Sequence, residues 1–122
     1  MLIDSNIIIY AAKPEHNALR QFIAEHTPAV SAVSYVEVLG YHQLTEQELQ
    51  YFEVFFAVAP ILALSQAILD QAVKLRQLKK MTLGDALVAS TALVHNLTLV
   101  TRNTQDFEWI SDLSVINAFE VE

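Results

Sequence analysis

The sequence predicts an α/β protein, a three-layer α/β/α sandwich in which helices cover both faces of a short, mostly parallel five-stranded sheet. Apolar residues make up 53% of the 122 residues, enough for one packed domain over residues 1–122. Short apolar segments alternate with longer segments of helical periodicity. The short segments show no polar alternation, which is typical of parallel strands buried on both faces.

The expected elements follow one another along the whole chain. We expect strands at Met1–Asp4, Ala29–Ala32 and Leu97–Thr101, a short strand within Val58–Leu64 and a final strand near Leu113–Asn117. We expect helices at Asn6–Ala12, 15–26, Ser34–Gln43, 46–57, from the cap Ser65 through Lys80, 84–95 and 104–110. Ser5, Ser34, Thr45 and Ser65 are the expected N-caps, because a hydroxyl can accept the free N–H groups of a helix start. Thr45 and Glu48 also have capping-box spacing.

Composition excludes several classes of protein. The chain has no cysteine, which excludes disulfides and cysteine metal sites and favours a cytoplasmic location. It shows neither a signal-peptide pattern nor an apolar run long enough to span a membrane. The only glycines are Gly40 and Gly84, so no glycine-rich nucleotide-binding motif is present. The four histidines lack metal-ligand spacing.

The charge distribution leaves the partner open. A net charge of −7 argues against tight nonspecific binding of nucleic acid. Four of the seven basic residues, however, fall between Lys74 and Lys80. This run fits two interpretations equally well: a solvated helix end, or a patch that faces a substrate.

Acidic residues stand at the points where a parallel sheet forms its sites. Asp4 ends the first strand, Glu37 lies in the helix after the second, and Asp85 lies in the first turn of an apolar helix. Asp106 follows the strand Leu97–Thr101. The carboxyl ends of parallel strands meet at one edge, so these groups can face one site.

Each acid also has a purely structural interpretation. Asp4 can accept backbone N–H groups at the next helix start. Ser34-x-x-Glu37 and Thr82-x-x-Asp85 both fit capping patterns. Asp106 or the nearby Asn103 can serve as a turn residue.

Taken together, the acids point to a metal site. Several carboxylates at one sheet edge repel one another, and a cation relieves that repulsion. Oxygen-only ligands favour Mg2+, with Mn2+ as an alternative. The sequence therefore predicts a divalent metal at the carboxyl ends of the strands.

The motifs resemble the PIN domain, specifically the VapC-like toxin nucleases of type II toxin–antitoxin pairs. The resemblance is carried by LIDSN at 2–6, SYVEVL at 34–39 and LGDALVASTALVHNLTLVTRNTQDF at 83–107, and it extends over essentially the whole chain. It implies a compact α/β/α fold around a short parallel sheet. It also implies an Mg2+-dependent endoribonuclease that hydrolyses RNA phosphodiester bonds by metal-activated water.

The resemblance assigns roles residue by residue. The implied catalytic and metal-binding acids are Asp4, Glu37, Asp85 and Asp106. Ser5, Asn6 and Asn103 are the implied supporting polar residues, and Asn103 competes with Asp106 for the fourth position. Arg102, Lys79 and Lys80 are hypothetical contacts to the substrate.

The implied partners are an RNA substrate such as tRNA or rRNA, a small antitoxin and a second copy of the chain. The aromatic helix with Tyr51, Phe52, Phe55 and Phe56 fits either core packing or partner binding. The main alternative function is a catalytically silent PIN-like protein that acts through binding of antitoxin or RNA. A phosphoacceptor switch is disfavoured because the last strands contain no lysine, and a nuclease for structured DNA because the expected insertions are missing.

Overall fold

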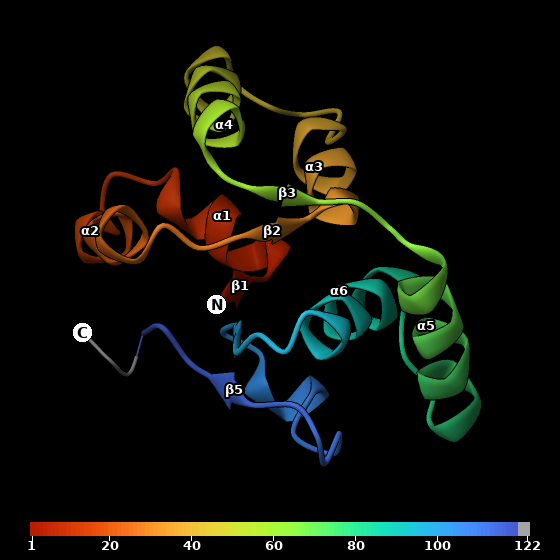
Figure 1. Ribbon diagram of the computed structural model, residues 1–122. Helices are drawn as coiled ribbons and strands as arrows, with labels where there is room; N and C mark the ends of the chain where they lie inside the picture. The colour runs from red at the N-terminus through yellow and green to blue at the C-terminus, as the bar shows by residue number, and fades with distance from the viewer. Residues whose placement is uncertain (120–122) are drawn as a thin grey trace.

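The computed structural model describes residues 1–119, so the predicted domain end at residue 122 lies outside the described residues. The strands are β1 (Leu2–Ile3), β2 (Val30–Ser31), β3 (Ile61–Leu62), β4 (Leu99–Val100) and β5 (Val115–Ile116). The helices are α1 (Ser5–Ala11), α2 (Asn17–His26), α3 (Ala32–Leu39), α4 (Glu46–Val58), α5 (Gln66–Leu78), α6 (Leu83–Val94) and the 3-10 helix η1 (Thr104–Asp106). Figure 1 shows their arrangement.

All strand pairs are parallel, as predicted. β1 pairs with β4 and β4 with β5, while β2 pairs with β3. A parallel bridge between Leu2 and Ala29 joins the two groups, and the Ile3 N–H donates to the Ala29 carbonyl at 3.0 Å. The resulting order is β3-β2-β1-β4-β5, with β1 in the centre.

The position of β1 determines where a site can form. From β1 the chain first builds outward through β2 and β3, then returns to add β4 and β5 on the other side. The order therefore reverses between β1 and β4. In open parallel sheets the crevice at the carboxyl ends of such a strand pair is the usual ligand site.

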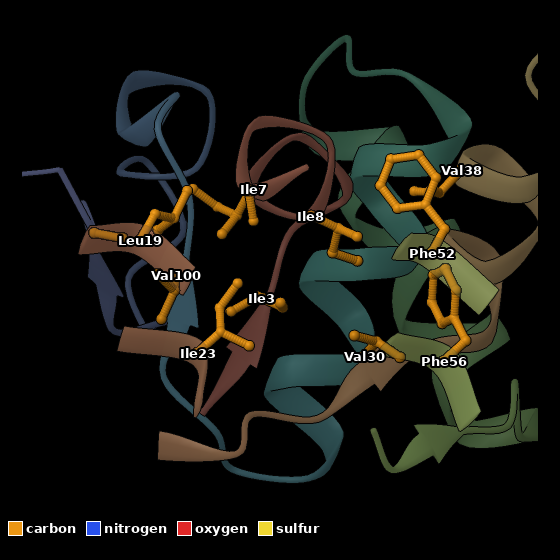
Figure 2. Packing of buried hydrophobic residues seen from close by; sticks show 12 residues of the cluster. Ile3, Ile7, Ile8, Leu19, Ile23, Val30, Val38, Phe52, Phe56 and Val100 are labelled. Carbon is orange, nitrogen blue, oxygen red and sulfur yellow. The ribbon is translucent and has the colours of Figure 1, made fainter. Parts of the chain in front are cut away.

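Two hydrophobic clusters cover the two faces of the sheet. Successive strand residues point to opposite faces. Ile3 and Val100 pack in one cluster with residues of α1, α2 and α4, while Leu2 and Leu99 pack in the other with residues of α5 and α6. Figure 2 shows the first cluster, with Phe52 and Phe56 of α4 directed into it. The predicted three-layer α/β/α sandwich is confirmed.

The capping predictions are right at two helices and wrong at two. Thr45 and Glu48 form the predicted capping box, and Ser65 caps α5. The Asp4 side chain caps α1, so Ser5 is the first helical residue and not the cap. Ser31 caps α3, and Ser34 is buried inside that helix, because β2 passes into the helix without a loop. The capping box of Ser34 and Glu37 is therefore absent.

Several predicted helices are too long. α3 ends at Leu39 with Gly40 as its C-cap, so the expected segment to Gln43 is not helical. The expected helix over 104–110 is reduced to Thr104–Asp106. α5 ends at Leu78, and Lys79 already has an extended backbone. Lys79 and Lys80 thus belong to the connection between α5 and α6, where they can line a site.

The aromatic residues of α4 divide between core and surface. Phe52 and Phe56 are buried in the core, while Tyr51 and Phe55 are only partly buried. Next to them, Val54 and Val58 are exposed. Core packing therefore accounts for one part of this helix, and the other part fits the interpretation as a partner-binding surface. Among residues 1–119, no helix combines the length and the apolar character that a membrane crossing requires.

Candidate active site

Asp4 is the buried centre of the candidate site. It follows β1, and its N–H donates to the Val100 carbonyl at 2.9 Å, which holds it beside the end of β4. Its side chain is only 5% exposed. Oδ1 accepts from the Ser5 N–H at 2.8 Å, and Oδ2 accepts from the Thr101 hydroxyl at 2.9 Å. Each carboxylate oxygen thus has one partner that fixes its orientation.

The hydroxyl groups of Ser5 and Ser34 link the first turn of α1 to α3. The Ser5 hydroxyl lies 2.8 Å from Glu37 Oε1 and 2.8 Å from the Ser34 hydroxyl. Each hydroxyl has one proton, so Ser34 can donate to Ser5 while Ser5 donates to the carboxylate. The first turn of α1 therefore orients Glu37, although Glu37 itself is exposed.

The amino-terminal turn of α6 brings the third acid. Thr82 caps this helix and accepts the Asp85 N–H at 3.1 Å. The Glu37 carboxylate lies directly against Gly84, because a Cβ atom placed there would be 2.6 Å from Glu37 Oε2. Only a residue without a side chain leaves this space, so Gly84 allows α3 and α6 to share the site.

The pKa values of Asp4 and Asp85 respond to burial and to the neighbouring acids. Burial raises the pKa of Asp4 from 3.8 to about 6, and the charges of Asp85 and Glu37 add to this rise. The hydrogen bonds from Thr101 and Ser5 act in the opposite direction. Burial likewise raises the pKa of Asp85, followed by the charges of Asp106 and Glu37. Among residues 1–119, no cation contributes to either shift.

The donor set fits a hard divalent cation. Within residues 1–119, no group of three or more His, Asp or Glu side chains has an arrangement that could hold a metal ion. Mg2+ does not require such a group, since it keeps several waters and uses one or two carboxylates together with substrate phosphates. Asp4 and Asp85 have raised pKa values that a nearby cation would lower. The residues present therefore fit Mg2+ or Mn2+.

A pocket of about 450 Å³ adjoins the acids. Its lining residues come from the connection between α5 and α6, the start of α6 and the segment around η1: Lys79, Lys80, Met81, Thr82, Asp85, Gln105, Asp106 and Trp109. Two acids and two lysines thus border the same hollow. Such a combination suits a phosphate group bound together with a metal ion.

The remaining predicted residues lie nearby with different contacts. The guanidinium of Arg102 lies 4.9 Å from the ring centres of both Tyr10 and Phe119. The Asn103 N–H donates to the Thr101 hydroxyl at 3.1 Å, while its side chain does not cap η1. Asn6 is a partly buried residue of α1.

Four contributors were missed by the sequence prediction: Thr101, Ser34, Gly84 and Trp109. Thr101 follows β4 as Asp4 follows β1, so the pairing of the first and fourth strands was the signal that could have found it. Gly84 and Trp109 had no such signal, because their roles depend on side chains from other elements.

Comparison with known proteins identifies the class. The model of the PIN domain family matches residues 1–112, so the chain belongs to the PIN domain family. A chain of a toxin–antitoxin complex from Klebsiella pneumoniae is 30% identical, with 96% of each chain covered and a TM-score of 0.75. None of the curated proteins matches this chain.

More distant structures have the same fold. VapBC2 from Rickettsia felis, bound to a DNA fragment from its promoter, is 24% identical with a TM-score of 0.80, covering 95% of this chain and 96% of that chain. DNA-bound VapBC from Salmonella typhimurium is 20% identical with a TM-score of 0.83 and 96% coverage of each chain. The predicted resemblance to VapC-like PIN domains is confirmed.

Proposed function

We propose that this chain is an Mg2+-dependent endoribonuclease and the toxin of a type II toxin–antitoxin pair. The observation that carries the proposal is the gathering of four acids near the carboxyl ends of β1 and β4: Asp4 is buried with its pKa raised to about 6, and Glu37, Asp85 and Asp106 lie close enough to raise the pKa of Asp4 or of Asp85. A carboxylate cluster of this kind is stabilised by a cation. Membership of the PIN domain family adds to this argument, because nuclease activity is general in that family.

The acids have graded roles in the proposal. Asp4 and Asp85 would hold Mg2+ (or Mn2+) most directly, and Glu37 and Asp106 directly or through water. A bound ion would supply an activated water and stabilise the charge that develops on the phosphate. The chain's other residues orient this set: Thr101 and the Ser5 N–H fix Asp4, the Ser5 hydroxyl fixes Glu37, and Thr82 fixes the start of α6.

The fourth position is assigned to Asp106 in this proposal. Asp106 acts on the pKa of Asp85 and lines the same pocket. The Asn103 backbone instead donates to Thr101, which suits a supporting role. Asn6 is retained as a second supporting residue.

The basic residues would bind the RNA backbone. Lys79 and Lys80 border the pocket that contains Asp85 and Asp106. Arg102 directly follows Thr101 and is exposed. These local cations can attract phosphates in spite of the net charge of −7.

The proposed protein partners are an antitoxin and a second copy of the chain. An apolar pocket of about 230 Å³ lies between α2 and α4 and includes Ile23, Phe55 and the exposed Val54 and Val58. A helix of an antitoxin with an apolar face would suit this groove. The substrate would be tRNA or rRNA, met in the cytoplasm.

The direct test is cleavage of purified tRNA and rRNA in Mg2+ by wild type and Asp4→Asn, with Glu53→Gln as the control. Glu53 is an exposed acid on α4, and it does not contribute to the raised pKa of Asp4 or of Asp85. We expect discrete products from wild type and Glu53→Gln, and none from Asp4→Asn or in EDTA. Folded wild type that leaves every RNA intact in both Mg2+ and Mn2+ would favour the alternative, a catalytically silent binding protein.

A further inference from the structure

Trp109 lies at the edge of the acidic pocket and is the only tryptophan of the chain. Its indole N–H donates to the Asp106 carbonyl at 3.0 Å. The ring is therefore tied to the same short 3-10 turn that carries the fourth acid. It is only partly buried, so part of its surface remains available to a ligand.

Lys79 stands over this ring. Its Nζ lies 5.5 Å from the ring centre, within the range of a cation–π interaction. The two residues border two hollows at once: the acidic pocket, and a second pocket of about 630 Å³ between α5, α6 and residues 109–112. A nucleic-acid strand that runs from the acids toward the second pocket would pass over Trp109 and Lys79.

The chemistry of this edge differs from that of the acids. An aromatic ring offers a stacking surface to any nucleobase, and an ammonium group offers a contact to a phosphate. Gln105, which also lines the pocket, can donate and accept hydrogen bonds at a base edge. The four carboxylates repel a polyanion, so a ribonuclease needs such attractive contacts just beside them.

We propose that Trp109, Lys79 and Lys80 form a subsite for one nucleotide of single-stranded RNA, adjacent to the phosphate that is cleaved. The Lys79 ammonium moves from the ring face to the neighbouring phosphate, which Lys80 also binds, and the base stacks on Trp109 in its place. This inference rests on the proposed function and deepens it, because it states which part of the RNA is held beside the acids. Stacking has little base preference, so the subsite contributes affinity more than sequence choice.

The single tryptophan gives the test a direct signal. The Asp4→Asn protein is titrated in EDTA with a short single-stranded RNA of mixed sequence while the indole emission is recorded. An abasic oligonucleotide of the same length is the control for phosphate binding alone. We expect saturable quenching by the RNA and much weaker quenching by the abasic strand.

Variants then separate the two kinds of contact. Trp109→Ala should bind the RNA about tenfold more weakly, measured by anisotropy of a labelled strand, and Trp109→Phe should retain most of the affinity. Lys79→Met should weaken binding and reduce its salt dependence. Tyr41→Ala, which removes an exposed aromatic ring between α3 and α4, is the matched control and should bind normally. If Trp109→Ala fails to fold, the comparison of quenching by the RNA and by the abasic strand, which needs no substitution at Trp109, provides the test.

The outcomes distinguish the subsite from the nuclease itself. Equal quenching by the abasic strand, or unchanged affinity in Trp109→Ala, would overturn the stacking. Quenching by an acidic peptide but not by RNA would overturn it in favour of a site for a protein tail. If wild type cleaves no RNA but base-dependent quenching is present, the proposed nuclease function fails while the nucleotide-binding role of Trp109 stands.

Discussion

The hydroxyl of Thr101 donates a 2.9 Å hydrogen bond to Oδ2 of Asp4, across 97 positions of sequence. Both side chains are buried, and they follow β1 and β4, the two strands between which the order of the sheet reverses. This bond lowers the pKa of a carboxyl group that burial and two neighbouring acids raise. Thr101 thus helps to keep Asp4 ionised inside the protein.

Removal of this hydroxyl should destabilise the protein. Thr101→Val keeps the shape but leaves Oδ2 of Asp4 without its donor, so we expect the free energy of unfolding at neutral pH to fall by about 1–3 kcal/mol. Urea denaturation measures this loss. Thr98→Val, at the opposite end of the same strand, is the control, and equal stability of the two variants would contradict the role of Thr101.

The raised pKa of Asp4 predicts an unusual pH dependence. The folded carboxyl has a pKa of about 6 against 3.8 for the ordinary group, so the folded state binds its proton more tightly. This contribution to stability is fully present below pH 4 and is lost as the pH rises through 6. By linkage the loss amounts to about 3 kcal/mol at neutral pH.

Asp4→Asn should therefore be more stable than wild type at pH 7.5 without metal, by about 1–3 kcal/mol. The difference should shrink toward pH 4, where both side chains are neutral. Denaturation at both pH values in EDTA measures it. If the variant is less stable than wild type at pH 7.5, ionisation of Asp4 does not lower the stability of the folded protein.

Gly84→Ala should separate stability from activity. The new methyl group would meet Glu37 Oε2, the far end of a flexible side chain, so the carboxylate must move while the helix gains a better helix former. We expect a stability change within about 1 kcal/mol of wild type, together with a clear loss of RNA cleavage. In a Glu37→Gln background the same substitution should have little further effect.

Arg102→Ala tests both contacts of that side chain. Its guanidinium packs on Tyr10 and Phe119, which contributes about 0.5–1 kcal/mol at an exposed site. If Arg102 also binds a phosphate, the salt dependence of RNA binding should decrease by roughly one contact. Arg102→Lys should retain the salt dependence. Unchanged salt dependence in Arg102→Ala would limit the residue to packing.

The layered architecture and the candidate acids could be predicted from local patterns in the sequence. Apolar segments without polar alternation are typical of parallel strands, and the pairs Leu2–Ile3 and Leu99–Val100 do supply both faces of the sheet. Asp4 and Asp85 could be proposed because each carboxylate stands next to a strongly apolar segment. The choice between capping and site was not decided by sequence, and Asp4 both caps α1 and lies among the acids.

The features that were mispredicted or missed depend on tertiary contacts. Ser34 has the spacing of a cap, but the direct passage from β2 into α3 moves the helix start to Ser31. The extended backbone at Lys79 places that lysine at a pocket, although the helical pattern extends further. Gly84 has a role only because Glu37 arrives from another helix.

The central claim is that the acids at the ends of β1 and β4 bind a divalent metal ion. Mn2+ binding followed by electron paramagnetic resonance tests it most directly, with wild type, Asp4→Asn, Asp85→Asn and the control Glu53→Gln. We predict bound Mn2+ in wild type and Glu53→Gln, displaced by excess Mg2+, and strongly weakened binding in both site variants. Equal binding by all four proteins, or none by folded wild type, would contradict the account.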